Sequence, residues 1–132
     1  MINIGILISG RGSNLQAIID ASERREIPAR VAVVISNNPE AYGLERAKKH
    51  HIPAVTIDNR GFKDKNTYEL EIVKVLQQHK IDLVCLAGYM RIVGPVLLEH
   101  YRGRMINIHP ALRIISAQTL LLAPFPVLRS YN

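Results

Sequence analysis

Ile4-Gly5-Ile6-Leu7-Ile8, followed at once by Ser9-Gly10-Arg11-Gly12-Ser13-Asn14, is the stretch that decides the fold. Its first part is an almost continuous apolar run, which is typical of a strand buried on both faces of a parallel sheet. Its second part is a glycine-containing turn that ends in two polar residues. The stretch predicts a central strand whose loop opens on the crevice where ligands gather in an open α/β sheet.

The first half of the chain alternates between strand and helix patterns. A helix is expected after the turn, with Ser13 or Asn14 as its cap, and a buried strand is expected over residues 31–35. Asn38-Pro39 predicts a second helix that runs to His50, because proline is favoured in the first turn of a helix. A short strand is expected over residues 54–57.

The second half continues the alternation. An amphipathic helix is expected over residues 63–79, with Tyr68, Ile72, Val75, Leu76 and His79 on one face and Glu69, Lys74 and Gln78 mostly elsewhere. A strand at 82–88, a short helix at 96–101 and a strand at 105–108 follow. This order predicts an α/β fold with a doubly wound parallel sheet and right-handed crossovers.

Composition narrows the class of protein. A chain of 132 residues with 48% hydrophobic content suits one globular domain. Its apolar runs are too short to cross a membrane, and its start lacks a signal-type pattern, so a cytoplasmic location is expected. Cys85 lies inside an apolar run and is expected to be a buried hydrophobe, in keeping with a reducing compartment.

The charge of the chain favours small anionic substrates over nucleic acid. The formal net charge is +6, but the basic residues are scattered and are not interleaved with aromatic ones. We therefore expect no nucleic-acid partner, and we expect the positive field to attract small anions. The histidines have no cysteine or carboxylate partners at ligand spacing, so no metal site is expected.

The turn after the first strand suits a phosphate. Gly10 and Gly12 let backbone N–H groups approach an anion, and the next helix adds its positive end. A Walker loop would need a Lys-Ser/Thr ending, which is absent. A dinucleotide fingerprint would need a third glycine where Leu15 stands and an acidic residue where Ser36-Asn37-Asn38 stands. The alternative is an ordinary strand-to-helix turn without a ligand.

Asn107 and His109 are the candidate catalytic pair. They lie two residues apart on an extended segment, so both side chains point to the same side. An asparagine amide can donate to a developing oxyanion, and histidine can move a proton near neutral pH. The pair suits acyl transfer to an amine, with no serine or cysteine nucleophile. The alternative is an Asx turn with a histidine hydrogen-bonded beneath Pro110.

Gly88-Tyr89-Met90-Arg91-Ile92 follows the fourth predicted strand and offers an apolar surface and a cation beside the same crevice. It is a candidate lining of a second substrate pocket. The alternative is a loop in which Met90 and Ile92 plug the sheet edge and Arg91 is solvated. Taken alone, this loop favours the alternative.

Together these motifs resemble the phosphoribosylglycinamide formyltransferase family of purine synthesis. The stretches that carry the resemblance are Ile8-Ser9-Gly10-Arg11-Gly12-Ser13-Asn14-Leu15-Gln16-Ala17-Ile18, Leu86-Ala87-Gly88-Tyr89-Met90-Arg91-Ile92 and Asn107-Ile108-His109-Pro110-Ala111-Leu112. Three motifs in the right order, each at a strand end, are far more specific than any one of them. The resemblance runs from the first residue to about Leu112.

The resemblance implies a Rossmann-like formyltransferase fold and transfer of a formyl group from 10-formyltetrahydrofolate, as co-substrate, to the amine of glycinamide ribonucleotide. It implies no metal. By motif it assigns the ribonucleotide phosphate to Gly12, Ser13 and Asn14, part of the folate pocket to Met90, Arg91, Ile92 and Val93, and catalysis to Asn107 and His109.

The resemblance stops where the composition changes. We expect a formyltransferase N-terminal domain over residues 1–112 and a divergent apolar tail over 113–132, with the C-terminal part of the family's fold missing. No acidic residue follows Glu99, so the family's catalytic aspartate has no counterpart, and the missing half can impair activity. The ending suggests a frameshifted or truncated product. The apolar surface left uncovered predicts self-association.

Two other functions stay open at this point. One is a catalytically inactive remnant that binds the ribonucleotide phosphate, since binding can survive the loss of a catalytic residue. The other is a related folate enzyme, such as formyltetrahydrofolate deformylase or methionyl-tRNA formyltransferase. The Gly-Arg-Gly-Ser-Asn loop favours the ribonucleotide enzyme, because a phosphorylated substrate gives that loop something to bind.

Overall fold

A parallel sheet forms the centre of the chain in the computed structural model, which describes residues 1–108 and 129–131. The strands are β1 (Ile2–Ile8), β2 (Ala29–Ser36), β3 (Ala54–Thr56), β4 (Leu83–Leu86), β5 (Met105–Ile108) and β6 (Arg129–Tyr131). They lie in the order β3-β2-β1-β4-β5-β6, and every neighbouring pair is parallel. This is the predicted doubly wound sheet.

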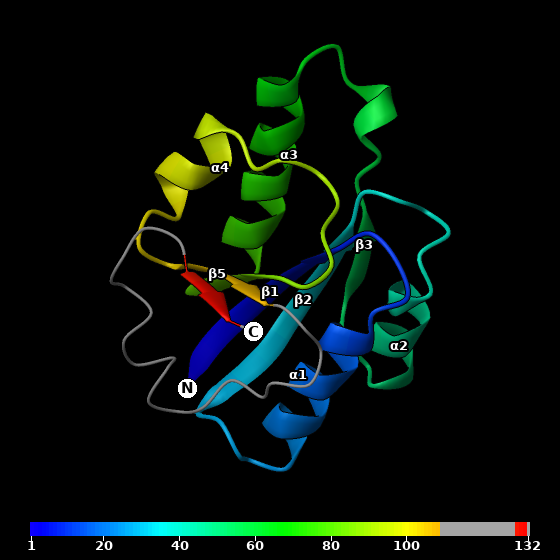
Figure 1. Cartoon of the computed structure of the whole chain (residues 1–132), viewed down its shortest axis with the longest axis vertical. Coiled ribbons are helices and arrows are strands. Elements are labelled where there is room, and N and C mark those ends of the chain that lie inside the picture. Colours follow the sequence, from blue (N-terminus) through cyan, green and yellow to red (C-terminus); the bar gives the residue numbers. More distant parts are fainter. Residues whose placement is uncertain (109–128, 132) are drawn as a thin grey trace.

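Helices cover both faces of the sheet, as the crossover connections require. The helices are α1 (Ser13–Glu23), α2 (Gly43–Lys49), α3 (Lys65–Gln78) and α4 (Pro95–His100), with a 3₁₀ turn, η1, at Asn59–Gly61. Figure 1 shows α1 and α2 on one face and α3 and α4 on the other. The chain winds outward from β1 to β3 and then returns to β4 beside β1, so the topological switch point lies between β1 and β4.

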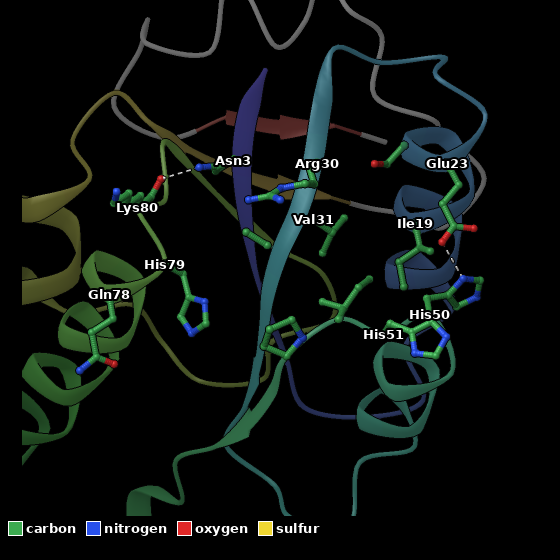
Figure 2. A pocket seen from close by; sticks show the side chains of 14 residues that line it. Asn3, Ile19, Glu23, Arg30, Val31, His50, His51, Gln78, His79 and Lys80 are labelled. Atoms are coloured by element: carbon green, nitrogen blue, oxygen red, sulfur yellow. Dashed lines mark hydrogen bonds and ion pairs between the residues drawn. The ribbon is translucent and has the colours of Figure 1, made fainter.

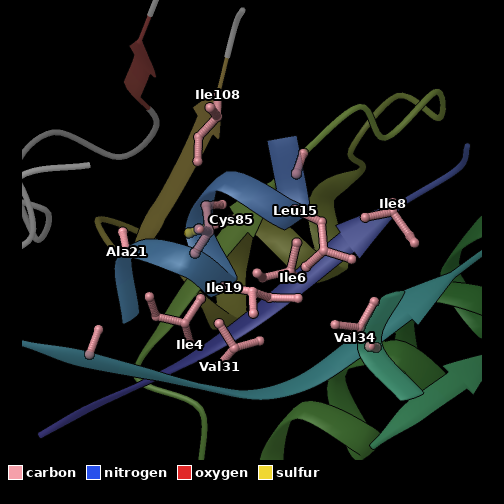
Figure 3. Close-up of a cluster of buried hydrophobic side chains, with 14 of the residues drawn as sticks. Ile4, Ile6, Ile8, Leu15, Ile19, Ala21, Val31, Val34, Cys85 and Ile108 are labelled. Carbon is pink, nitrogen blue, oxygen red and sulfur yellow. The ribbon is translucent and has the colours of Figure 1, made fainter. Parts of the chain in front are cut away.

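Two apolar clusters hold the helices to the sheet. On one face Ile4, Ile6 and Ile8 of β1 pack against Leu15 and Ile19 of α1 (Figure 3). On the other face Leu7, Val33 and Val84 pack with the apolar side of α3, namely Tyr68, Ile72, Val75 and Leu76. Alternation along buried strands supplies both clusters, and each fully buried large side chain contributes roughly 1.5–3 kcal/mol of transfer free energy.

Cys85 lies in the middle of β4 and is fully buried, as the sequence predicts. Burial raises the pKa of its thiol to about 12. The thiol therefore stays protonated at neutral pH and behaves as a small apolar side chain.

The structure corrects the predicted cap of the first helix. Neither Ser13 nor Asn14 caps α1: the cap position is Gly12, whose φ is 81°, and no side chain completes the cap. The side chain of Asn14 donates instead to the carbonyl oxygen of Ile108, at 3.3 Å. The side chain of Asn14 therefore bonds to β5 instead of to an N–H group at the start of α1.

The predicted start of the second helix is also wrong. The helix begins at Gly43 instead of Asn38. Asn38 Oδ1 accepts from the backbone N–H of Glu40 at 3.0 Å, and Asn38 Nδ2 donates to Ser9 O at 3.3 Å. An Asx-type turn fixed to the neighbouring loop thus occupies the segment where the helix was expected.

Glu69 is the third correction. Of the face predicted for α3, Tyr68, Ile72, Val75 and Leu76 are buried as expected, whereas His79 is only partly buried and follows the helix. Glu69, which was expected elsewhere, is buried with them and is only 1% exposed. Buried carboxylates need hydrogen-bond donors, and Glu69 has two backbone donors near the start of α4.

The described residues include only a short piece of the C-terminal segment, so the predicted tail over residues 113–132 stays a prediction. Within residues 113–132, Arg129–Tyr131 forms β6, which pairs in parallel with β5. The rest of that segment, together with His109, lies outside the described residues. In the part of the chain that the structure describes, no helix is long and apolar enough to span a membrane.

Candidate active site

The structure brings the loops after β1 and β4 together with the last residues of β5, at the carboxyl ends of these strands. These strands are neighbours, and their carboxyl ends face the same way. The backbone N–H of Met90 donates to Ser9 Oγ at 2.8 Å, and Asn14 Nδ2 donates to Ile108 O at 3.3 Å. Residues far apart in sequence thus form one polar cluster at the switch point of the sheet.

The loop of residues 9–14, here called the anion loop, rests on α2 through its carbonyl oxygens. The N–H of Gly43 donates to Gly10 O at 3.1 Å, and Arg46 Nε donates to Arg11 O at 2.7 Å. Because a trans peptide places its carbonyl and its N–H on opposite sides, the N–H groups of Arg11 and Gly12 face away from α2. Such N–H groups can bind an anion.

The start of α1 adds further donors to the same place. The N–H groups in the first turn of a helix have no intrahelical acceptor, and here no side chain caps them. Ser13 is exposed, and the positive end of the helix macrodipole adds to the attraction for an anion. The anion loop therefore presents a set of oriented donors without a carboxylate among its residues.

Gly12 is required for this arrangement. Its φ of 81° lies in the left-handed region, and a Cβ atom there would lie 2.8 Å from Gly43 Cα. The loop and α2 thus approach through two glycines. A side chain at position 12 would both strain the backbone and push the loop off α2.

Asn14, the last residue of the anion loop, also contacts β5. Its Nδ2 contacts Ile108 O, so its side chain faces β5, and its Oδ1 is buried without a hydrogen-bond partner among the described residues. The backbone N–H of Asn14 remains at the helix start with that of Ser13. The side chain therefore links the anion loop to the strand that carries Asn107.

Asn107 lies at the end of β5, opposite Leu86 of β4. It is half-buried and shares the strand face of Met105, which packs on the side of α3 and α4. No hydrogen bond between described residues uses its side-chain amide. His109, the other predicted catalytic residue, lies outside the described residues, and its placement stays a prediction.

The segment of residues 88–94, here called the β4–α4 segment, carries the predicted folate residues. Met90 is 82% exposed and Ile92 is 81% exposed, so neither plugs the sheet edge. Val93 packs against the cluster under α3 and α4. Arg91 Nε is buried and has no hydrogen-bond partner among the described residues. Exposed apolar side chains beside an unpaired donor are suited to a ligand with a flat apolar body and polar edges.

Tyr89 of this segment meets Tyr68 of α3. The hydroxyls of Tyr68 and Tyr89 are 3.3 Å apart, and burial raises the pKa of each phenol above its usual value. Both phenols therefore remain protonated near neutral pH. They can donate hydrogen bonds but are unsuited to act as general bases.

Sequence reasoning missed the residues that support these loops. It placed Ser9 in the anion loop, but it did not predict that Ser9 binds Met90 and donates to Asn37 Oδ1 at 2.5 Å. It gave no role to Arg46. The one available signal was the polar Ser36-Asn37-Asn38 segment, because it also ends a strand at this edge.

A separate hollow of about 530 Å³ lies at the opposite edge of the sheet (Figure 2). It is lined by residues that begin β1 and β2 and residues that end α1, α2 and α3, among them Asn3, Arg30, His50, His79 and Lys80. Basic residues at helix C-termini are ordinary partners of the macrodipole. Among the described residues, no three histidine, cysteine or carboxylate side chains gather as metal ligands.

The arrangement of sheet and loops matches that of a known family. The family model described as "Formyl transferase" matches residues 2–113. The chain belongs to the formyl transferase family. In solved structures of the family, the glycinamide ribonucleotide transformylase 1 of Symbiobacterium toebii superposes with a TM-score of 0.81 at 47% identity. That superposition covers 83% of this chain and 52% of the other.

Curated relatives agree with this assignment. Phosphoribosylglycinamide formyltransferase of Escherichia coli is 46% identical over 110 residues, which are 83% of this chain and 52% of that enzyme. The human trifunctional purine biosynthetic protein adenosine-3 is 40% identical over 109 residues, 83% of this chain and 11% of that protein. The chain thus spans about half the length of its bacterial formyl transferase relative.

Proposed function

We propose that this chain acts in transfer of a formyl group from 10-formyltetrahydrofolate to the amine of glycinamide ribonucleotide, a step of purine biosynthesis. The observation that carries the proposal is the anion loop. Its carbonyl oxygens are bound to Gly43 and Arg46, which turns the N–H groups of Arg11 and Gly12 outward beside an uncapped helix start. A phosphate monoester is the ligand that such donors fit best.

The residues of the β4–α4 segment fit the formyl donor. The flat ring system of a folate would lie against Met90, Ile92 and Val93, and Arg91 Nε offers a buried donor that lacks a partner among the described residues. When bound, the folate supplies the activated formyl group. The residues of this segment orient it at the end of β4, next to Asn107 on β5.

The proposed chemistry needs two side chains, those of Asn107 on β5 and of His109, which is two residues later in the sequence. The amine nitrogen of the ribonucleotide forms a bond to the formyl carbon, and the bond from that carbon to the donor nitrogen breaks. The proton lost by the amine goes to the donor nitrogen. Asn107 donates to the formyl oxygen as its negative charge grows, and His109 carries the proton.

A substitution at Ser13 tests the phosphate assignment. Ser13→Asp puts a negative charge against the bound phosphate, so glycinamide ribonucleotide should bind at least about tenfold more weakly, while 10-formyltetrahydrofolate binding stays unchanged. Lys48→Asp is the matched control, because Lys48 is exposed on α2 and contacts Glu45 instead of the loop. Unaltered ribonucleotide titration in Ser13→Asp would remove the phosphate assignment.

The compartment and the partners of the protein are part of the same proposal. We place the protein in the cytoplasm, where small-molecule purine precursors are made, and assign it no nucleic-acid or membrane partner.

We also expect self-association through apolar surface at the edge of the sheet. Light scattering during size-exclusion chromatography at high protein concentration tests this, and a clean monomer would remove the expectation.

A further inference from the structure

Glu69 is a buried carboxylate that the proposed chemistry does not use. It lies on α3, is 1% exposed, and takes part in no ion pair of the described residues. Such a group is costly to bury, because it loses the hydration of its charge. Its hydrogen-bond partners therefore indicate what it does.

Both partners of Glu69 lie where the β4–α4 segment enters α4. The N–H of Gly94 donates to Glu69 Oε2 at 2.6 Å, and the N–H of Leu97 donates to Glu69 Oε1 at 3.1 Å. No residue at the start of α4 caps the helix with its own side chain. A carboxylate from another helix thus takes the place of the local cap, and its charge suits the positive helix end.

The β4–α4 segment is consequently fixed at two points by side chains of other elements. Ser9 Oγ accepts from Met90 near its start, and Glu69 accepts from Gly94 at its end. Between these points lie Arg91, Ile92 and Val93. Gly94 itself approaches the carboxylate closely, since a Cβ atom there would lie 2.9 Å from Glu69 Oε1.

We propose that Glu69 is a positioning residue for the folate site: its carboxylate sets the path of residues 90–93 and thereby the affinity for the formyl donor. The inference rests on the proposed function. It concerns the donor alone, because the anion loop is supported by Gly43 and Arg46 on the other face of the sheet.

Glu69→Gln tests the inference with the full 132-residue chain. The amide keeps the shape of the side chain but can accept through one oxygen only, so either Gly94 or Leu97 faces an NH₂ group. We expect about tenfold weaker binding of 10-formyltetrahydrofolate with unchanged binding of glycinamide ribonucleotide. Amide hydrogen exchange should speed up at Gly94 and Leu97. Glu71→Gln, two residues along α3 and half-buried, is the matched control.

A second variant keeps the test decisive if Glu69→Gln does not fold. Gly94→Ala retains the carboxylate but puts a Cβ atom 2.9 Å from Glu69 Oε1, so the contact between the carboxylate and the segment must change, and it should show the same selective loss of donor binding. Faster amide exchange with unchanged affinity for the donor would show that Glu69 acts on stability only, and it would overturn the inference. An equal loss of affinity for the donor and for the ribonucleotide would overturn it as well. Absence of donor binding by the unaltered chain would overturn the proposed function, and this inference with it.

Discussion

The backbone N–H of Met90 donates to the hydroxyl of Ser9 at 2.8 Å, across 81 residues of sequence. The same hydroxyl donates to Asn37 Oδ1, so Ser9 connects the ends of β1, β2 and β4. Ser9 therefore joins the candidate phosphate site to the candidate folate site through its hydrogen bonds. This bond fixes the start of the β4–α4 segment, whereas the carbonyl oxygens of the anion loop have bonds of their own to α2.

Ser9→Ala should weaken binding of the formyl donor. The variant leaves the N–H of Met90 without its acceptor, and a lost hydrogen bond of this kind is worth about 1 kcal/mol, or several-fold in affinity. Calorimetric titration with 10-formyltetrahydrofolate measures the effect. Ser22→Ala is the control, because the Ser22 hydroxyl donates to Ala29 O at the other edge of the sheet. Equal donor affinity in the Ser9 and Ser22 variants would show that the link has no role in binding.

Gly12→Ala should destabilise the protein and abolish ribonucleotide binding. The new Cβ atom would meet Gly43 Cα at 2.8 Å, and the positive φ adds strain of about 1 kcal/mol or more. Gly10→Ala is a matched control in the same loop, because nothing lies within 4 Å of its Cβ position. Urea unfolding and ribonucleotide titration compare the two. If both variants behave alike, the contact between Gly12 and Gly43 does not shape the loop.

Stability at acid pH should depend on Asp58. Its side-chain hydrogen bonds to Arg60 lower the pKa of the Asp58 carboxyl from 3.8 to about 2. A lowered pKa in the folded state stabilises the fold above pH 3.8, and this contribution is lost as the pH falls toward 2. Arg60→Leu should raise the pKa of Asp58 toward 3.8. Carboxyl ¹³C NMR titration of the unaltered protein and of Arg60→Leu measures the pKa of Asp58. The same titration midpoint in both proteins would exclude the Arg60 interaction as the cause of the lowered pKa.

The fold follows from local patterns in the sequence. Continuous apolar runs such as residues 4–8 predict strands buried on both faces, and their alternation with amphipathic segments predicts the doubly wound sheet. The meeting of the first two motifs with the end of β5 also follows, since the carboxyl ends of parallel strands lie together. Two of the errors concern helix starts, where Asn14 bonds to the end of β5 and Asn38 bonds to the loop after β1 instead of capping their own helices.

The supporting contacts of the site could not be predicted in the same way. Glu69 bonds to groups 25 and 28 residues later, and Ser9 bonds to a group 81 residues later. No periodicity encodes such pairs, because they depend on how two packed elements meet. Glu69 in particular has the sequence pattern of a solvent-facing residue, and only its burial against α4 shows otherwise.

Formyl transfer by the chain is the decisive measurement for the proposed function. The full 132-residue chain is mixed with 10-formyltetrahydrofolate and glycinamide ribonucleotide, and loss of the formyl donor is followed by absorbance, with Asn107→Ala and Lys48→Ala alongside. We expect turnover by the unaltered chain and by Lys48→Ala, and a loss of about 10²–10³-fold in Asn107→Ala, as for removal of an oxyanion donor. No turnover by the unaltered chain while both ligands bind, or equal rates in both variants, would contradict the proposed function.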